Sequence, residues 1–207
     1  MDATVRDAID QLAALQSTRR RGAAKRLRKM RAFDAGSALL GALEKEIQDP
    51  RTWETQYQMI MALGECGYEA ALPTLERLAV NTFDATMVHV ALGDAIVRLS
   101  RRNDRDVSSL LRILRQSKNS MLIDGALRAV AMLRIVPEPG EIGEILSYVE
   151  CLEPNDPLRF WVAAAAPGWR HPDLGTFLDV CERSGRDDIT AAAKSARAGK
   201  YKKWSPL

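Results

Sequence analysis

A short apolar pattern recurs along the chain at nearly constant spacing, and it limits the fold more than any other feature. Each copy starts with an apolar residue and has further apolar or small residues three and seven positions later. Those offsets place three side chains on one face of a helix. The five copies start at Leu40, Leu72, Val107, Ile142 and Leu174, about 32 to 35 residues apart. This period is typical of a repeat built from two helices.

A second amphipathic segment precedes each copy. Its apolar residues also recur at helical spacing, as in Ala23, Leu27 and Met30. Gly, Pro, Asn or Asp separate the segments, and several of these residues are favoured at helix N-caps. No segment shows a persuasive strand pattern. The sequence therefore predicts an all-α chain.

The predicted helices are expected to stack, because a single helical hairpin cannot enclose its own apolar face. With 207 residues the chain can bury a sizeable core. We predict one domain over 1–207, a right-handed α-solenoid of about five helix pairs. The prediction places a cap helix at 3–15, repeats over about 17–184, and a C-terminal helix with a basic tail at 187–207. A non-repetitive bundle of the same helices is the alternative.

Three segments of the chain resemble HEAT-like repeats. They are RRGAAKRLRKM at 20–30, ALPTLERL at 71–78 and DPLRFWVAAAAPGW at 156–169. The resemblance covers about residues 17–184 and extends to the short bacterial repeats of bilin lyases and of many small adaptors. The consensus of such repeats is weak, so the resemblance implies the architecture of a binding scaffold rather than one particular function.

The chemistry-bearing residues form no catalytic or metal-binding pattern in the sequence. Neither His89 nor His171 has a partner at ligand spacing, and His89 is expected to be a satisfied, partly buried histidine. The cysteines Cys66, Cys151 and Cys181 are far apart and form no CxxC pair. Phosphate-binding, dinucleotide-binding and hydrolase motifs are absent. We therefore predict a non-enzymatic protein without a cofactor, a metal or a small-molecule substrate.

The sequence also bears on the compartment. The first residues contain acids and no long apolar run, unlike a signal peptide. No stretch approaches the roughly 20 apolar residues that a bilayer span needs. We expect a cytoplasmic protein whose cysteines stay reduced.

Charge is distributed in alternating blocks, although the formal net charge is only +3. Residues 1–31 are basic and 32–100 acidic, and such blocks can steer a partner of opposite charge. The first block provides six candidate partner-binding residues: Arg19, Arg20, Lys25, Arg26, Arg28 and Lys29. This basic helix could bind an acidic protein or nucleic-acid phosphates; an anionic membrane is the least expected partner. A merely solvated outer face is the structural alternative.

Superposition of the five copies predicts a row of surface residues on the second helix of each pair. The row contains Lys45, Arg77, Arg112, Ser147 and Asp179. The next position gives a more apolar row, Glu46, Leu78, Ile113, Tyr148 and Val180. If the second helices line a concave side, this mixed groove suits a protein better than a phosphate backbone. Lys45, Arg77, Arg112 and Tyr148 are therefore further candidates.

Aromatic residues gather late in the sequence. They are Phe160, Trp161, Trp169 and Trp204. Because Phe160 and Trp161 are adjacent, they cannot both face a helical core, and Trp161 is a candidate contact for a partner. Filling space beside the alanines at 163–166 is the alternative role.

These features favour a protein-binding module, either an adaptor, a regulator or an inhibitor such as a toxin-immunity protein. Its partner is expected to be another protein with an acidic surface. Nucleic-acid binding is the second reading, because HEAT-like alkyl-DNA glycosylases are similar in length, repeats and basic character. Their acidic, aromatic and arginine residues cannot be matched here residue by residue. A chaperone resembling the bilin lyases is the third reading.

Overall fold

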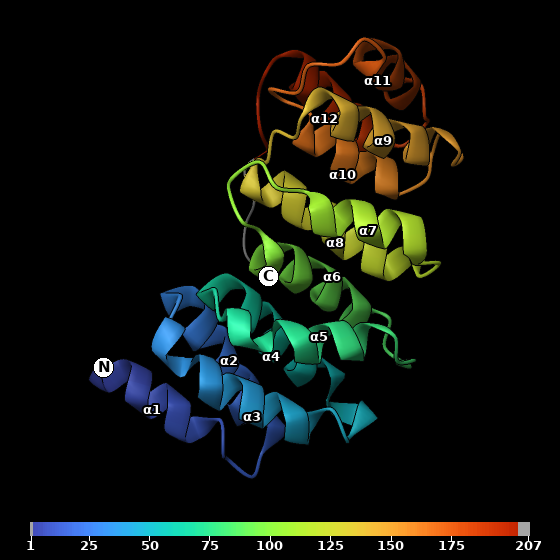
Figure 1. Cartoon of the computed structure of the whole chain (residues 1–207). Coiled ribbons are helices and arrows are strands. Elements are labelled where there is room, and N and C mark those ends of the chain that lie inside the picture. Colours follow the sequence, from blue (N-terminus) through green and yellow to red (C-terminus); the bar gives the residue numbers. More distant parts are fainter. Residues whose placement is uncertain (1, 203–207) are drawn as a thin grey trace. The chain divides into compact units, whose positions relative to one another are not determined.

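The computed structural model describes residues 2–202, which contain twelve α-helices and no strand (Figure 1). The all-α prediction is therefore confirmed. The chain divides into two compact units, Met1–Ser100 and Arg101–Leu207. Unit 1 contains α1 (Ala3–Gln11), α2 (Ser17–Met30), α3 (Gly36–Glu46), α4 (Trp53–Cys66), α5 (Leu72–Ala79) and α6 (Met87–Ser100). Unit 2 contains α7 (Ser108–Gln116), α8 (Ser120–Leu133), α9 (Pro139–Glu150), α10 (Leu158–Ala165), α11 (Leu174–Glu182) and α12 (Asp187–Arg197).

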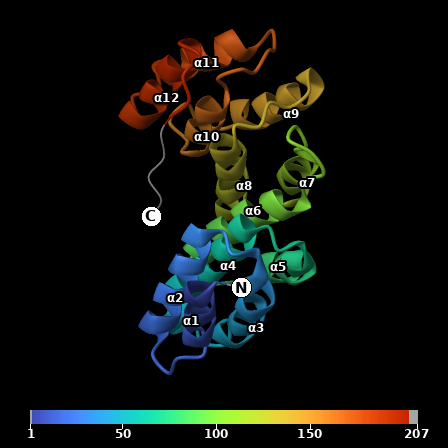
Figure 2. The same cartoon turned by 90° about the vertical axis from the view of Figure 1, so that its left-hand side faces the viewer.

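The even-numbered helices form the closely packed layer of each unit. In unit 1, α2 packs along α4 and α4 along α6, whereas α3 and α5, although fully described, share no comparable contact. Figure 2 shows α3 and α5 on one side of unit 1, with α2 and α4 on the other. In unit 2, α8 packs along α10 and α10 along α12. The odd-numbered helices of unit 1 therefore do not pack on one another as its even-numbered helices do.

Small residues explain the close packing of α4 and α6. Gly64 faces Ala95, and a Cβ atom built on Gly64 would lie only 2.9 Å from the Ala95 Cα atom. Side chains are rarely tolerated at such a distance, so this position requires glycine. Ala62 on α4 and Ala91 on α6 are also fully buried.

The pairing of helices differs from the prediction. Five of the six odd-numbered helices pack mainly against the helix that follows them: α1 on α2, α3 on α4 and α5 on α6 in unit 1, and α7 on α8 and α11 on α12 in unit 2. The sixth, α9, contacts α7, α10 and α11. The pairs predicted from the sequence instead combined each even-numbered helix with the odd-numbered helix that follows it. The segment predicted as a cap helix at 3–15 is the first member of such a pair, and it ends at Gln11.

Four of the described helices end in the same turn, and α12, followed by Gly199 (φ 64°), is one of them. α2, α4 and α8 are each followed by a residue with a left-handed backbone: Arg31 (φ 48°), Gly67 (φ 73°) and Arg134 (φ 54°). After α2, the backbone N–H of Ala32 donates to the carbonyl of Leu27 at 3.1 Å, and α4 and α8 repeat this bond. This is the Schellman arrangement, which favours glycine at the left-handed position.

The predicted core stripes are correct on some helices and displaced on others. Ile142, Ile145 and Val149 of α9 are buried as expected. On α3 the inward face contains Leu39 in place of Leu40, beside the predicted Leu43. Met30 was predicted to be buried but is 37% exposed. Among residues 2–202, no helix combines the length and apolar character needed to cross a bilayer.

Candidate functional site

The basic helix predicted at the N-terminal end is α2, and about half of its positive charge is neutralised within unit 1. Four of its arginines form ion pairs: Arg20 with Glu46, Arg21 with Glu54, Arg26 with Asp7 and Arg28 with Glu65. Arg28 is only 4% exposed, because the close packing of α2 on α4 places its guanidinium beside Glu65 and Gln58. This pairing gives Arg28 a contact inside unit 1 that the sequence did not predict, and its binding to a partner stays a prediction.

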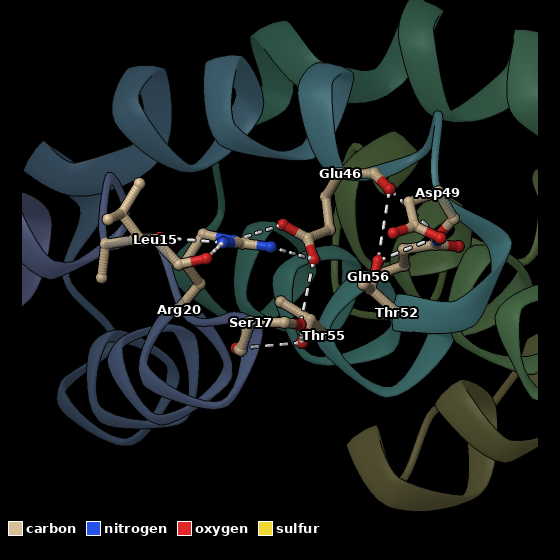
Figure 3. A network of polar contacts seen from close by, with 9 residues as sticks. Leu15, Ser17, Arg20, Glu46, Asp49, Thr52, Thr55 and Gln56 are labelled. Carbon is tan, nitrogen blue, oxygen red and sulfur yellow. Dashed lines mark hydrogen bonds and ion pairs between the residues drawn. The ribbon is translucent and has the colours of Figure 1, made fainter.

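Arg20 is the centre of a polar network that ties α2, α3 and α4 together (Figure 3). Its Nε and Nη2 atoms donate to the two carboxylate oxygens of Glu46 at 2.6 and 2.9 Å, and Nη1 donates to the carbonyls of Ala14 and Leu15, both at 2.8 Å. The bond to Glu46 raises the pKa of the Arg20 guanidinium. Charge-assisted bidentate pairs of this kind are among the stronger hydrogen-bonded contacts. Arg20 thus has a structural role.

The same network fixes the start of α4. Ser17 donates to Glu46 at 3.1 Å and shares a hydrogen bond of 2.7 Å with the Thr55 hydroxyl. The Gln56 amide donates to the backbone carbonyls of Glu46 at 3.2 Å and Asp49 at 2.8 Å. Glu46 and Gln56 are both buried. These bonds position the end of α3 and the connection between α3 and α4.

The remaining cations of α2 are exposed and have no ion-pair partner within residues 2–202. They are Arg19, Lys25, Lys29 and Arg31. Met30 and Phe33, at the same end as Lys29 and Arg31, are 37% and 61% exposed. We call these six residues the α2 ridge. It combines positive charge with exposed apolar side chains.

A hollow of about 530 Å³ lies between the odd-numbered helices of unit 1, and we call it the α3/α5 furrow. Its apolar lining includes Ile47, Trp53 and Phe83, and its polar rim includes Glu44 and Arg77. Trp53 and Phe83 are partly exposed. Arg77 is exposed and has no ion-pair partner among the described residues. The furrow therefore presents aromatic surface beside an exposed cation.

A second hollow, of about 700 Å³, lies between α1 and α3. Its walls include Leu12, Leu15, Gly41 and Lys45, and Glu44 borders both hollows. Leu15 is completely exposed, and no atom of the described residues lies within 4 Å of a Cβ atom built on Gly41. The two hollows occupy equivalent positions, each between successive odd-numbered helices.

The row predicted on the second helices is at the surface. Lys45, Arg77, Arg112, Ser147 and Asp179 are all exposed. The more apolar row does not form a surface, because Glu46, Leu78 and Ile113 are buried, while Tyr148 and Val180 are half-buried. The structure brings Arg77 together with Trp53 and Phe83, and Lys45 with Arg20, whereas Arg112 and Tyr148 lie in unit 2 on α7 and α9. A concave groove lined by these residues stays a prediction.

Two of the aromatic residues of unit 2 pack against each other, and a third is buried separately. Phe160 and Trp161 are both half-buried and lie edge to face, with ring centroids 4.9 Å apart. The Trp161 indole donates to Asp124 at 2.9 Å, and burial raises the pKa of the Asp124 carboxyl. Trp169 is buried and donates to the backbone carbonyl of Ile135. Trp204 lies outside the described residues. Trp161 thus has an internal contact that its candidate role did not anticipate.

His89 and two of the three cysteines are buried inside the protein. His89 is buried, its Nε2 atom lies 3.0 Å from the Asn81 carbonyl, and its ring packs on Phe83, which confirms the prediction of a satisfied histidine. Burial raises the pKa of the Cys66 and Cys181 thiols to about 11. No group of three metal-binding side chains occurs within residues 2–202.

The aromatic residues of the furrow were missed by sequence reasoning. Trp53 starts α4, and Phe83 lies in the connection before α6, so neither belongs to the repeated pattern. Three turn or loop residues near them, Pro50, Asn81 and Asp84, mark these connections in the sequence. Comparison with models of protein families, with curated proteins and with solved structures finds no match to this chain.

Proposed function

We propose that this chain is an α-solenoid of HEAT-like helix pairs and serves as a non-enzymatic protein-binding module in the cytoplasm. An adaptor, a regulator and an inhibitor of the toxin-immunity kind all fit this description. The stacking of even-numbered helices within each unit supports a repeat architecture. The repeat pattern in the sequence supports the same reading.

The observation on which the proposal depends is the α3/α5 furrow. Trp53 and Phe83 expose aromatic surface there, and aromatic residues with arginine are enriched at the centres of protein interfaces. Arg77, which has no ion-pair partner within residues 2–202, provides a cation in the lining that is suited to an acidic side chain of a partner. A furrow with apolar walls and a few polar groups fits a projecting loop or helix of another protein.

The furrow can be tested with a single charge reversal. Arg77→Glu should abolish or strongly weaken recovery of the native partner from a lysate of the source cells, because a repulsive charge then replaces the cation. Lys118→Glu makes the same change at an exposed position in unit 2 and should leave recovery unchanged. Equal recovery of the partner with both variants would show that the furrow does not bind it.

Nucleic-acid binding is retained as the second candidate, favoured by one observation. Arg19, Lys25, Lys29 and Arg31, cations of α2 or its C-terminal cap, have no ion-pair partner in the part of the chain that the structure describes. Binding through them would release counterions and weaken steeply with salt. Fluorescence anisotropy of labelled DNA and RNA at low salt tests this candidate, and an absence of binding there would exclude it.

A further inference from the structure

The left-handed cap of α2 carries an arginine where glycine is favoured. α4 ends in the same turn with Gly67, so the fold itself does not require a side chain at this position. A non-glycine residue with this backbone is uncommon and strained. Strain at a defined position is a reason to look for a function of the side chain.

The other left-handed arginine has an identifiable contact. Arg134 ends α8, and its guanidinium lies 4.9 Å from the centroid of the Tyr201 ring, a cation–π contact within unit 2. Arg31 is exposed and has no ion pair or ring contact with another described residue. The side chain of Arg31 is therefore available to a molecule outside this chain.

The surroundings of Arg31 indicate what that molecule is. Lys29 is exposed next to it, and Phe33 and Met30 expose large apolar side chains. The Phe33 ring is held edge to face against Tyr68, with centroids 6.1 Å apart, so it offers a positioned aromatic surface. Asp34 is the only acid in the sequence between residues 17 and 35. This end of the α2 ridge is thus both cationic and apolar.

We infer that this end of the α2 ridge binds an acidic segment of a partner protein that contains an apolar or aromatic residue. Carboxylates of the segment pair with Arg31 and Lys29, and its apolar residue packs on Phe33 and Met30. A phosphate backbone would use the cations but would leave both apolar side chains unmatched. The inference depends on the proposed protein-binding function and specifies the chemistry of the partner.

The test uses the full chain and short synthetic peptides. One set contains Asp, Glu, Gly and Ser with a single central Phe, Leu or Met; a second set has the same charge without the apolar residue; single-stranded DNA of equal length is the third probe. Affinities are measured by fluorescence anisotropy. The variants are Arg31→Gly, Phe33→Ser and, as the matched control at the equivalent cap, Arg134→Gly.

The expected result is tighter binding of an apolar-containing acidic peptide than of the all-acidic peptide. Arg31→Gly should weaken that binding by about threefold to fivefold, as loss of one exposed ion pair predicts. The same variant should melt at a higher temperature than the wild type, because glycine relieves the left-handed strain. Phe33→Ser should remove the preference for the apolar-containing peptide, and Arg134→Gly should leave all affinities unchanged.

Three results would overturn the inference: no binding of any acidic peptide, unchanged affinity in Arg31→Gly, or binding of DNA at least as tight as that of the best peptide. A higher melting temperature of Arg31→Gly together with unchanged affinity would assign the arginine no role in binding. The peptide measurements can fail while Arg77→Glu still weakens recovery of the native partner from a lysate. The inference and the proposed function can therefore fail independently.

Discussion

Replacement of Gly64 by alanine tests the close approach of α4 and α6. In an exposed helix interior, alanine in place of glycine stabilises a protein by about 1 kcal/mol, because glycine loses more backbone entropy on folding. At Gly64 the new methyl group would lie 2.9 Å from both Cα and Cβ of Ala95 and 3.4 Å from Cδ of Arg98. The backbone contact cannot move aside as the end of a flexible side chain can, so the helices must separate.

The magnitude follows from two opposing effects. Overpacking of a close-packed core costs about 1–3 kcal/mol. After subtraction of the gain of about 1 kcal/mol in helix propensity, Gly64→Ala should destabilise the protein by up to about 2 kcal/mol. Gly22 of α2 is the matched control, since it is helical and exposed and no atom within residues 2–202 lies within 4 Å of its Cβ position. Gly22→Ala should stabilise the protein by about 0.5–1 kcal/mol.

Urea unfolding followed by circular dichroism measures both variants. The difference between their free energies of unfolding removes the helix propensity that both substitutions share, and leaves the overpacking of α4 against α6, about 1–3 kcal/mol. Equal stabilisation by the two alanines would show that α4 and α6 do not approach as closely as described. The explanation of their close packing by small residues would then be wrong.

Three further predictions concern buried charge, pH and thiol reactivity. Glu46→Gln should destabilise the protein by about 2–3 kcal/mol in urea unfolding, because it leaves the partly buried Arg20 without its charged partner. The control Arg51→Ala breaks an exposed ion pair and should cause no measurable change in stability. Equal effects of the two variants would show that the Arg20–Glu46 network does not stabilise the fold. Burial would raise the pKa of Asp106, but it is outweighed by hydrogen bonds from the backbone N–H groups of Arg102 at 3.0 Å and Ser108 at 2.9 Å, so this pKa lies well below its usual range. The stability lost in Asp106→Asn should thus be greatest at neutral pH and should shrink below about pH 4, where the unfolded carboxyl is protonated; a loss independent of pH would contradict this cause. Iodoacetamide should modify the exposed Cys151 in the folded protein. Cys66 and Cys181 are buried and have pKa values of about 11, so they should react only after unfolding. If mass spectrometry finds Cys66 modified as fast as Cys151, the burial of Cys66 is contradicted.

The helices could be predicted from the sequence because their apolar spacing is a local property. Ile142, Ile145 and Val149 lie on one face of α9 whatever surrounds it, and they are buried as predicted. The same spacing shows that a helix has an inward face but not which neighbour covers it. This is why α3 was paired with the helix before it, although it packs on α4.

The residues whose roles were not predicted from the sequence depend on partners far along the chain. Arg28 is buried because Glu65, 37 residues later, pairs with it. Glu46 can be buried on the inward face of α3, where an apolar residue is expected, because Arg20 neutralises its charge. Trp53 and Phe83 come from different connections, so only the packing of unit 1 brings them to one furrow. Local patterns contain no information of that kind.

The most direct test of the protein-binding claim is photo-crosslinking from the α3/α5 furrow in living cells. A photoreactive phenylalanine analogue at Phe83 samples the furrow, and the same analogue at the exposed Met121 of α8 samples a surface outside it. We predict a discrete protein adduct from position 83 that Arg77→Glu removes, and no such adduct from position 121. An adduct with nucleic acid, or no adduct from position 83, would contradict the claim.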